Sequence, residues 1–359
     1  MNLANESFEQ RSEVDIDAIV DLYIPEPHSE SGRSYPTFEH GARGAYFHDG
    51  SPMRRMVRDD LALSLWVDRL HAELATAHKD RIDFTAEYDN RRFRVHREET
   101  TEGWLNTLRR LPSQCPTLDD LRFTNPAARD FLMLPTFNQG GLILFAALNG
   151  QGKSTVAGAT IKSRLMKFHG EGFSLEDPAE LPLAGFHGEG TFRQTEVKNG
   201  DWAGAMGKFG RLLPASRPAI LYIGEVRDPE CAAETIKLAL AGALVITTVH
   251  SDNAISALAR MVALAESHLK EATSLMLAQA LRLVVHQKLV LSPQERGWAR
   301  GQISTTMLYS NQESSPVAVA LRDKKFEQMK STLNQQKTLF DNHTITTPTS
   351  ELLRKLQGT

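Results

Sequence analysis

A glycine-rich loop followed by a lysine and two hydroxyl residues is the part of this sequence best suited to chemistry. Four apolar residues, 142–145, precede it. An apolar strand, a glycine-rich loop and a helix start in this order predict a phosphate-binding loop, or P-loop. Glycines let backbone N–H groups approach phosphate oxygens, and the helix N-terminus adds positive potential. The residues predicted to bind a nucleotide are Asn149, Gly150, Gln151, Gly152, Lys153, Ser154 and Thr155.

Two side chains of this loop have separate expected roles. Lys153 is placed to reach the outer phosphates, and the Ser154 hydroxyl to ligate Mg²⁺. Ala147 stands where the P-loop pattern has its first glycine, and alanine there would cost about 1–2 kcal/mol if a positive φ is required. A strand-to-helix turn that binds no ligand is the alternative interpretation. Charge-assisted phosphate contacts outweigh such strain, which favours a nucleotide site.

Carboxylates follow two other apolar segments. Glu225 comes directly after residues 220–224, where an acid would support Mg²⁺ directly or through water. Glu176, Asp177 and Glu180 follow residues 172–175, and Glu180 is the one we assign to activate the attacking water. The alternative for this cluster is a solvated loop in which Asp177 caps a helix.

His250 ends a further apolar segment, 244–249. It could contact the γ-phosphate and signal its loss, whereas a lone histidine at a strand end is more often structural. Ligands of open α/β sheets bind where the carboxyl ends of the strands meet. We therefore expect Lys153, Glu180, Glu225 and His250 to converge on one edge of one sheet. Arg227 could pair with the nearby acids or form only a surface ion pair.

The composition is that of an ordinary globular protein. The chain has 359 residues, a formal net charge of −3 and two cysteines, Cys115 and Cys231, without metal-binding spacing. No basic excess indicates nucleic acid, and the cysteine usage fits a reducing compartment. The N-terminal stretch lacks the apolar core of a signal peptide, and the apolar runs are too short to span a bilayer. We expect a cytoplasmic protein that meets the inner membrane only through partners.

The pattern of elements predicts two domains, 1–122 and 123–359. In the first, apolar spacing predicts a helix within 51–77, and alternation predicts a β-hairpin over 81–99 that turns at Asp89 and Asn90. In the second, helices and strands alternate over about 110 residues, as in a parallel sheet covered on both faces. Residues 185–200 are predicted as a polar loop, and the chain from residue 269 as mostly helical.

These motifs together resemble the secretion and type IV pilus motor ATPases, the PilT/DotB-like family that includes conjugation and type II secretion ATPases. The resemblance covers residues 91–290. It rests on RFRV (92–95), the Walker A motif GQGKST (150–155), the Asp box EDPAE (176–180), the Walker B motif ILYIGEVRD (220–228), the His box GALVITTVHSDNA (242–254) and HQKLV (286–290).

The resemblance implies an α/β fold, with a RecA-like P-loop NTPase core preceded by a smaller α+β PAS-like N-terminal domain. It implies a homo-hexameric motor that hydrolyses ATP with Mg²⁺ and works with inner-membrane platform or secretion-system proteins. Glu180 matches the catalytic glutamate, Glu225 the Walker B acid and His250 the His-box histidine. Arg94 and Arg109 match arginines that approach the nucleotide from the N-terminal domain.

Two other functions stay open beside this motor. One is a nucleotide-gated scaffold that scarcely hydrolyses ATP, supported by Ala147 and by Glu102 and Ala215 at positions where the family has arginines. The other is a hexameric nucleic-acid motor, which the acidic net charge and the lack of a basic, aromatic strand-binding loop disfavour. The segment 320–326 does not match the characteristic segment of pilus retraction motors. This favours conjugation, secretion or pilus assembly.

Overall fold

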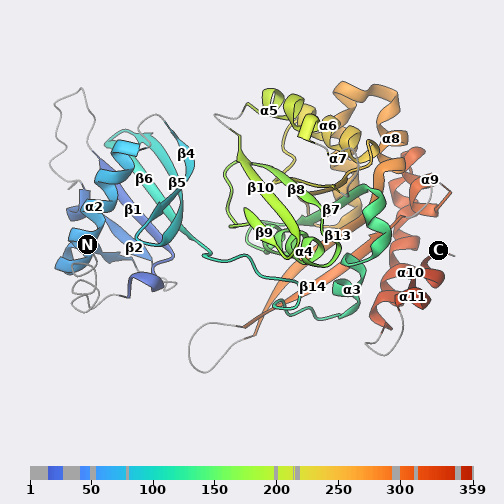
Figure 1. The fold of residues 1–359 in the computed structure, drawn as a ribbon, viewed down its shortest axis with the longest axis horizontal. Coiled ribbons are helices and arrows are strands. Elements are labelled where there is room, and N and C mark those ends of the chain that lie inside the picture. The colour runs from blue at the N-terminus through green and yellow to red at the C-terminus, as the bar shows by residue number, and fades with distance from the viewer. Residues whose placement is uncertain are drawn as a thin grey trace. The chain divides into compact units, whose positions relative to one another are not determined.

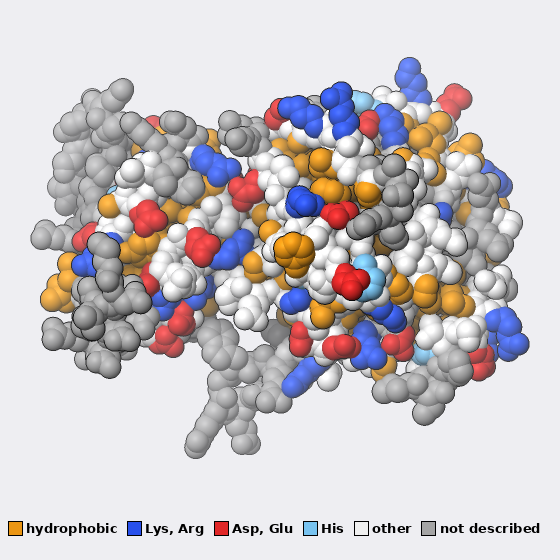
Figure 2. Space-filling view, in the orientation of Figure 1, with side chains coloured by type: hydrophobic (Ala, Val, Ile, Leu, Met, Phe, Trp, Pro, Cys, Tyr) orange, Lys and Arg blue, Asp and Glu red, His pale blue; other side chains and the backbone are white. Residues whose placement is uncertain are grey.

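The chain divides into two compact units, Met1–Ser113 and Gln114–Thr359 (Figure 1). Each unit has its own sheet and its own hydrophobic core. Acidic and basic side chains are interspersed on the visible surface of both (Figure 2). The computed structural model describes residues 15–26, 41–48, 54–77, 81–197, 201–212, 214, 219–292, 300–310, 314–343 and 349–357.

The N-terminal unit is an antiparallel sheet of six strands in the order β3-β2-β1-β6-β5-β4. Helix α2 (Leu61–Ala77) packs on one face, where Leu63, Val67 and Leu70 join the apolar side of the strands. This is an α+β architecture, in which strands such as β1 and β4 bury alternate residues on one face of the sheet and a helix packs on that sheet. The strands are β1 (Asp21–Glu26), β2 (Tyr46–His48), β3 (Arg55–Met56), β4 (Asp83–Tyr88), β5 (Arg91–Thr100) and β6 (Gly103–Leu111).

The predicted hairpin of this unit is confirmed. Strands β4 and β5 pair antiparallel, and the two residues between them, Asp89 and Asn90, have φ angles of 52° and 57°. A two-residue turn with both φ values positive matches the right-handed twist of the strands, and Asp and Asn tolerate it better than most residues. The predicted helix within 51–77 is shorter than expected, because β3 and a 3₁₀ turn (Val57–Asp59) precede α2.

The second unit is built on an eight-stranded sheet in the order β14-β13-β7-β12-β11-β8-β10-β9. The six inner strands are mutually parallel, and β14 and β9 pair antiparallel at the two edges. The strands are β7 (Gly141–Ala147), β8 (Glu171–Glu176), β9 (Gly185–His187), β10 (Gly190–Glu196), β11 (Ala219–Ile223), β12 (Leu244–His250), β13 (Leu281–Ser292) and β14 (Arg300–Tyr309).

Helices cover both faces of this sheet. Those on one face include α5 to α9, whereas α3, α4 and α11 pack on the other. Within the described ranges, none of the helices is long and apolar enough to cross a membrane. The helices are α3 (Ala127–Leu132), α4 (Lys153–Phe168), α5 (Trp202–Phe209), α6 (Pro229–Leu240), α7 (Ala254–Leu269), α8 (Thr273–Ala280), α9 (Pro316–Arg322), α10 (Met329–Asp341) and α11 (Thr349–Gln357).

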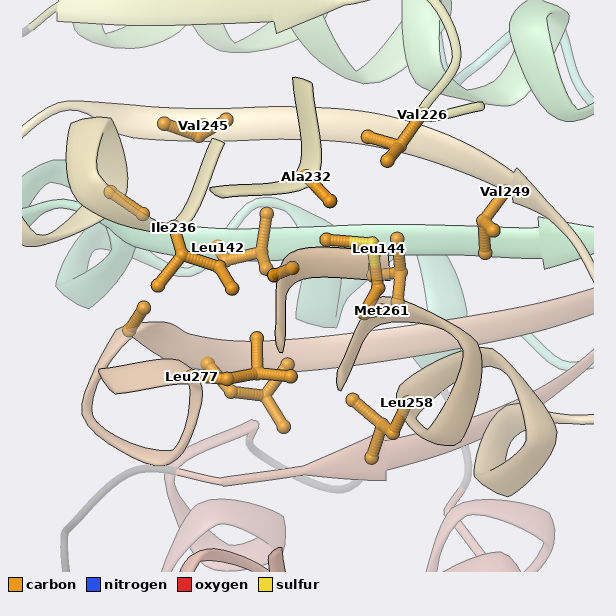
Figure 3. Close-up of a cluster of buried hydrophobic side chains, with 14 of the residues drawn as sticks. Leu142, Leu144, Val226, Ala232, Ile236, Val245, Val249, Leu258, Met261 and Leu277 are labelled. Atoms are coloured by element: carbon orange, nitrogen blue, oxygen red, sulfur yellow. The ribbon is translucent and has the colours of Figure 1, made fainter. Parts of the chain in front are cut away.

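Strand β7 shows how the sheet is held between its two helical layers. Leu142 and Leu144 enter the core under α6, α7 and α8, together with Met261 and Leu277 (Figure 3). The intervening residues, such as Phe145, enter the core on the opposite face. Every residue of β7 is buried, which explains the unbroken apolar run before the P-loop. The loop at its end therefore rests on a rigid base.

Two segments differ from the sequence prediction. Residues 281–292 form β13 instead of a helix, and residues 185–196 form the β9–β10 hairpin instead of a loop. Strand β13 is buried from Leu283 to Gln287 between β7 and β14. A strand buried on both faces has the same apolar run as a buried helix, so periodicity alone cannot distinguish them. The hairpin lies at the sheet edge, where the outward-facing positions of β10 are polar, although Phe186 of β9 is also exposed.

In the sequence, the boundary between the two units follows Ser113, nine residues before the predicted boundary at 122/123. Cys115 and Leu118 are buried in the core of the second unit, and the Leu118 N–H donates to the Ser163 hydroxyl at 2.9 Å. Farther along, the Ile303 N–H of β14 donates to the Arg122 carbonyl at 2.7 Å. These contacts explain why residues 114–122 group with the second unit, although Pro116 and the preceding Pro112 are typical of a linker.

Candidate nucleotide-binding site

The P-loop connects the carboxyl end of β7 to the first turn of α4. Gly150 and Gly152 have φ angles of 72° and 77°, so glycine is favoured at both for conformational reasons. Ala147 does not have a positive φ, and it pairs with His250 as a residue of β7. The strain considered for alanine at this position therefore does not arise.

Lys153 is the first residue of α4 and is buried. Its ammonium lies 3.0 Å from the carbonyl oxygens of Ala147 and Leu148 and 3.2 Å from His250 Nδ1. Burial lowers the pKa of Lys153, whereas the nearby charges of Glu225 and Glu180 act in the opposite direction. The loop thus holds a cation at its centre, and this cation is electrostatically linked to both predicted acids.

His250, at the end of β12, connects Lys153 to Glu225. Its Nε2 lies 2.9 Å from Glu225 Oε1, and its Nδ1 faces the Lys153 ammonium. An ammonium can only donate, so Nδ1 accepts, and in the neutral imidazole Nε2 carries the proton on the side of Glu225. Burial lowers the pKa of His250, which favours this neutral form. The result is a chain of polar contacts from lysine through histidine to glutamate.

Glu225 lies just after β11 and is bound through both carboxylate oxygens. Oε1 lies 2.9 Å from His250 Nε2, and Oε2 lies 2.6 Å from Arg227 Nη2. Arg227 therefore pairs with the nearby acid, as one of the two sequence interpretations held. Asp228 is the N-cap of α6, where its carboxylate accepts from the Cys231 N–H at 2.9 Å. Glu225 is thus oriented toward the P-loop by groups of two neighbouring segments.

The loop after β8 separates the roles of its acids. Glu176 is buried, and its Oε1 accepts from the Ser174 hydroxyl at 2.5 Å and from Gln194 Nε2 at 2.8 Å. Gln194 also accepts from the Leu183 N–H at 2.9 Å, so it fixes the loop that carries Glu180. Glu180 is partly exposed, and its charge acts on Lys153. Glu176 therefore shapes the loop, whereas Asp177 and Glu180 are partly exposed, and the catalytic role of Glu180 stays a prediction.

We expect the substitution Glu176→Gln to remove a pH dependence of stability. Burial raises the pKa of Glu176 from 4.5 to about 7. Between these values the native state keeps a proton that the unfolded state has lost, so the free energy of unfolding falls as pH rises. The loss between pH 4.5 and pH 7 is at most about 3 kcal/mol. Glutamine stays neutral throughout this range. Chemical denaturation of E176Q at pH 5 and pH 7.5 should therefore show no such fall in the free energy of unfolding.

The exposed acid Glu189 provides the control for this measurement. Its side chain is 85% exposed, so Glu189→Gln should keep the wild-type pH dependence. An equal loss of stability with rising pH in wild type and E176Q would contradict the assignment to Glu176.

The donor set fits Mg²⁺ held together with a nucleotide. The Ser154 hydroxyl lies beside Tyr222, a buried residue of β11 whose pKa burial raises well above its ordinary value. A serine hydroxyl oxygen has two lone pairs, so it can ligate a cation while it donates its proton to a neighbour. Across the part of the chain that the structure describes, no three His, Cys, Asp or Glu residues form a metal-binding group. Mg²⁺ in nucleotide sites needs few protein ligands, since phosphates and water complete its shell, so Ser154 and Glu225 would suffice.

Arg94 and Arg109 lie in the N-terminal unit, on neighbouring strands. They are cross-strand partners of β5 and β6. Arg94 Nε lies 3.4 Å from Asp83, and Arg109 Nε lies 2.9 Å from Asp21. The Arg109 side chain is 65% exposed. The structure thus places both arginines together on the outward face of this sheet, and their role toward a nucleotide stays a prediction.

Of the predicted site residues, the structure brings Lys153, His250 and Glu225 into direct contact and places Glu180 near them. Asn149 and Thr155 lie on the same loop and the same first helical turn. Sequence reasoning assigned no role to Tyr222 or Gln287, which also contact the loop. For Tyr222 the available signal was the one polar group in an otherwise apolar strand, whereas Gln287 stands between two other polar residues, His286 and Lys288. Ala215 lies outside the described residues.

This sheet, with a P-loop after β7, a histidine at the end of β12 and acids at the ends of β11 and β8, defines a RecA-like P-loop NTPase fold. Residues 72–344 match the family of type II/IV secretion system proteins. Because this is most of the chain, the protein belongs to that family, as the resemblance to secretion and pilus motor ATPases predicted.

Relatives and solved structures agree with this assignment. The chain is 32% identical over 219 residues to the uncharacterized protein YggR of Escherichia coli, covering 60% of this chain and 63% of that protein. It is 28% identical over 190 residues to the type IV pilus ATPase PilU of Pseudomonas aeruginosa, covering 53% and 47%. These matches span less than two thirds of either relative.

Two solved structures share the fold over nearly their whole length. The pilus retraction motor PilT with bound ADP has a TM-score of 0.66 at 20% identity, covering 94% of this chain and 93% of that one. The Legionella pneumophila ATPase DotB has a TM-score of 0.65 at 18% identity, covering 99% and 94%. At these identities the likeness establishes the fold, with an N-terminal domain before a RecA-like core.

Proposed function

We propose that this protein is an Mg²⁺-dependent ATPase that binds ATP at residues 149–155. The observation that carries the proposal is the chain of polar contacts from Lys153 through His250 to Glu225, with a hydrogen bond from Lys153 to His250 Nδ1 and 2.9 Å between His250 Nε2 and Glu225 Oε1. It joins a cation for the phosphates, a candidate γ-phosphate sensor and a metal-supporting acid at one sheet edge. Ser154 and Glu225 would hold Mg²⁺, which neutralises phosphate charge when bound.

In this proposal Glu180 orients the attacking water and accepts its proton. Its carboxylate is partly exposed and lies within electrostatic range of Lys153. A general base placed in this way contributes about 10²–10⁴-fold to a rate. Arg94 and Arg109 would approach the nucleotide, where an arginine can contribute about 10³–10⁵-fold. A ligand that binds Lys153 would change one of the two polar contacts of the His250 ring. His250 would therefore report the loss of the γ-phosphate.

We further propose that six copies form a ring that drives a type IV secretion, conjugation or type IV pilus machine. Family membership and the name of PilU as a type IV pilus ATPase support this assignment. The protein would act in the cytoplasm, at the inner membrane, through platform or secretion-system proteins. Direct contact with nucleic acid is not part of the proposal.

Phosphate release by the purified protein tests this function. We expect turnover of MgATP that stops with EDTA, and a sixfold monomer mass by light scattering when ATP is present. Tight MgATP binding without turnover, in the presence of membrane components, would favour the nucleotide-gated scaffold instead. Stimulation by single-stranded DNA would favour the nucleic-acid motor. Failure to bind MgATP would contradict all three.

A further inference from the structure

Strand β13 continues past the point where its neighbour β7 ends. The last paired residues of the two strands are His286 and Ala146. Beyond them, the P-loop residue Gln151 occupies the place of a neighbouring strand. Its side-chain Oε1 accepts from the Leu289 N–H at 2.8 Å, and its carbonyl accepts from Gln287 Nε2 at 2.6 Å. The backbone carbonyl and the side-chain oxygen of Gln151 are therefore both bonded to β13.

Gln287 is a residue that lowers the stability of the fold at this position. Its side chain is fully buried, and its Oε1 has no hydrogen-bond partner among the described residues. An unsatisfied buried acceptor is destabilising, so packing alone would favour an apolar residue of the same size. Turned the other way, Oε1 would face the Gln151 carbonyl, and two acceptors would repel. The bond to the P-loop therefore determines how this amide is oriented.

The bond also orients one amide of the loop. In a trans peptide unit the carbonyl and the following N–H point in opposite directions. Because the Gln151 carbonyl is turned toward Gln287, the Gly152 N–H points away from β13. A Cβ on Gly152 would lie 3.6 Å from Gln287 Nε2, which shows how closely β13 supports the loop from behind.

We propose that Gln287 is a positioning residue for the nucleotide site. It holds the Gln151 carbonyl on the side of β13, so that the Gly152 N–H is aimed at phosphate before a nucleotide arrives. The inference rests on the proposed ATP site and adds a residue that does not touch the nucleotide. It also assigns the side chain of Gln151 to the loop's support, leaving the backbone of that residue for phosphate.

The substitution Gln287→Leu tests the proposal, with Gln336→Leu as a matched control. Gln336 is also a buried glutamine that bonds a strand backbone, at Tyr309 N and O of β14, away from the P-loop. Loop positioning is used equally in the ground and transition states, so Q287L should raise KM for MgATP while kcat changes little. We expect a rise in KM and in the dissociation constant of MgADP of about tenfold, equivalent to one lost oriented bond.

The control and a second variant keep the test decisive. Q336L should keep the wild-type KM while losing at least as much thermal stability as Q287L. Gln151→Ala, which removes only the Leu289 contact, should raise KM in the same direction and serves if Q287L does not fold. Unchanged KM in Q287L or Gln151→Ala, or an equal rise in Q336L, would overturn the inference. Wild-type protein that binds no MgADP would overturn the proposed function and this inference together.

Discussion

Replacing Lys153 with alanine is expected to weaken nucleotide binding by roughly 100-fold. The ammonium is buried at the centre of the loop, 3.0 Å from two backbone carbonyls and 3.2 Å from His250. A charge-assisted contact of this kind contributes up to about 3 kcal/mol, which corresponds to roughly a 100-fold loss of affinity. Calorimetric titration with MgATP and MgADP measures the effect directly.

A second lysine of the same helix is the control. Lys162 Nζ donates to the Cys115 carbonyl at 2.6 Å, in the core region of α4 and away from the P-loop. Lys162→Ala also removes one lysine from α4 but should keep nucleotide affinity near the wild-type value. Comparable binding by K153A and the wild-type protein would exclude this loop as the nucleotide site.

Replacing Glu180 with glutamine should leave nucleotide binding intact and stop turnover. Glutamine has the same size as glutamate but cannot accept a proton from water at neutral pH, so we expect kcat to fall by about 10²–10⁴-fold. The dissociation constant for MgATP should change little, because Lys153, His250 and Glu225 keep their mutual contacts. Single-turnover phosphate release separates chemistry from binding.

The exposed carboxylate of Glu189 again provides the comparison. Glu189→Gln removes the same charge from the surface of the same unit and should leave kcat unchanged. Equal turnover in the wild-type protein and E180Q would remove Glu180 from the mechanism. A large rise in the MgATP dissociation constant of E180Q would mean that this acid acts in binding.

The sequence predicted the parts of the site that follow from local pattern and chain order. The P-loop is encoded in seven consecutive residues, and the parallel strands β7, β8, β11 and β12 end at one edge because helices return the chain between them. These facts place Lys153, Glu225 and His250 together before any coordinates are known.

Contacts that depend on strand register could not be predicted in this way. Gln287 reaches Gln151 across 136 positions of the chain, and only the pairing of β13 with β7 brings them together. The misassigned helix over 281–292 removed that pairing from consideration. Tyr222 was missed for a related reason. An aromatic residue in an apolar strand has the pattern of a core residue, and only the fold places it beside Ser154.

The order of strands makes the two flanks of the P-loop electrically unequal. On the β12 side, the His250 imidazole contacts the loop lysine, and the Glu225 carboxylate contacts that imidazole. On the β13 side, the groups that reach the loop are a neutral amide and a backbone N–H. Substitutions on the first flank should therefore alter how the site responds to pH and ionic strength. Substitutions on the second flank should alter how well the loop fits a nucleotide without changing its charge. The charge and the shape of one loop can therefore be changed independently.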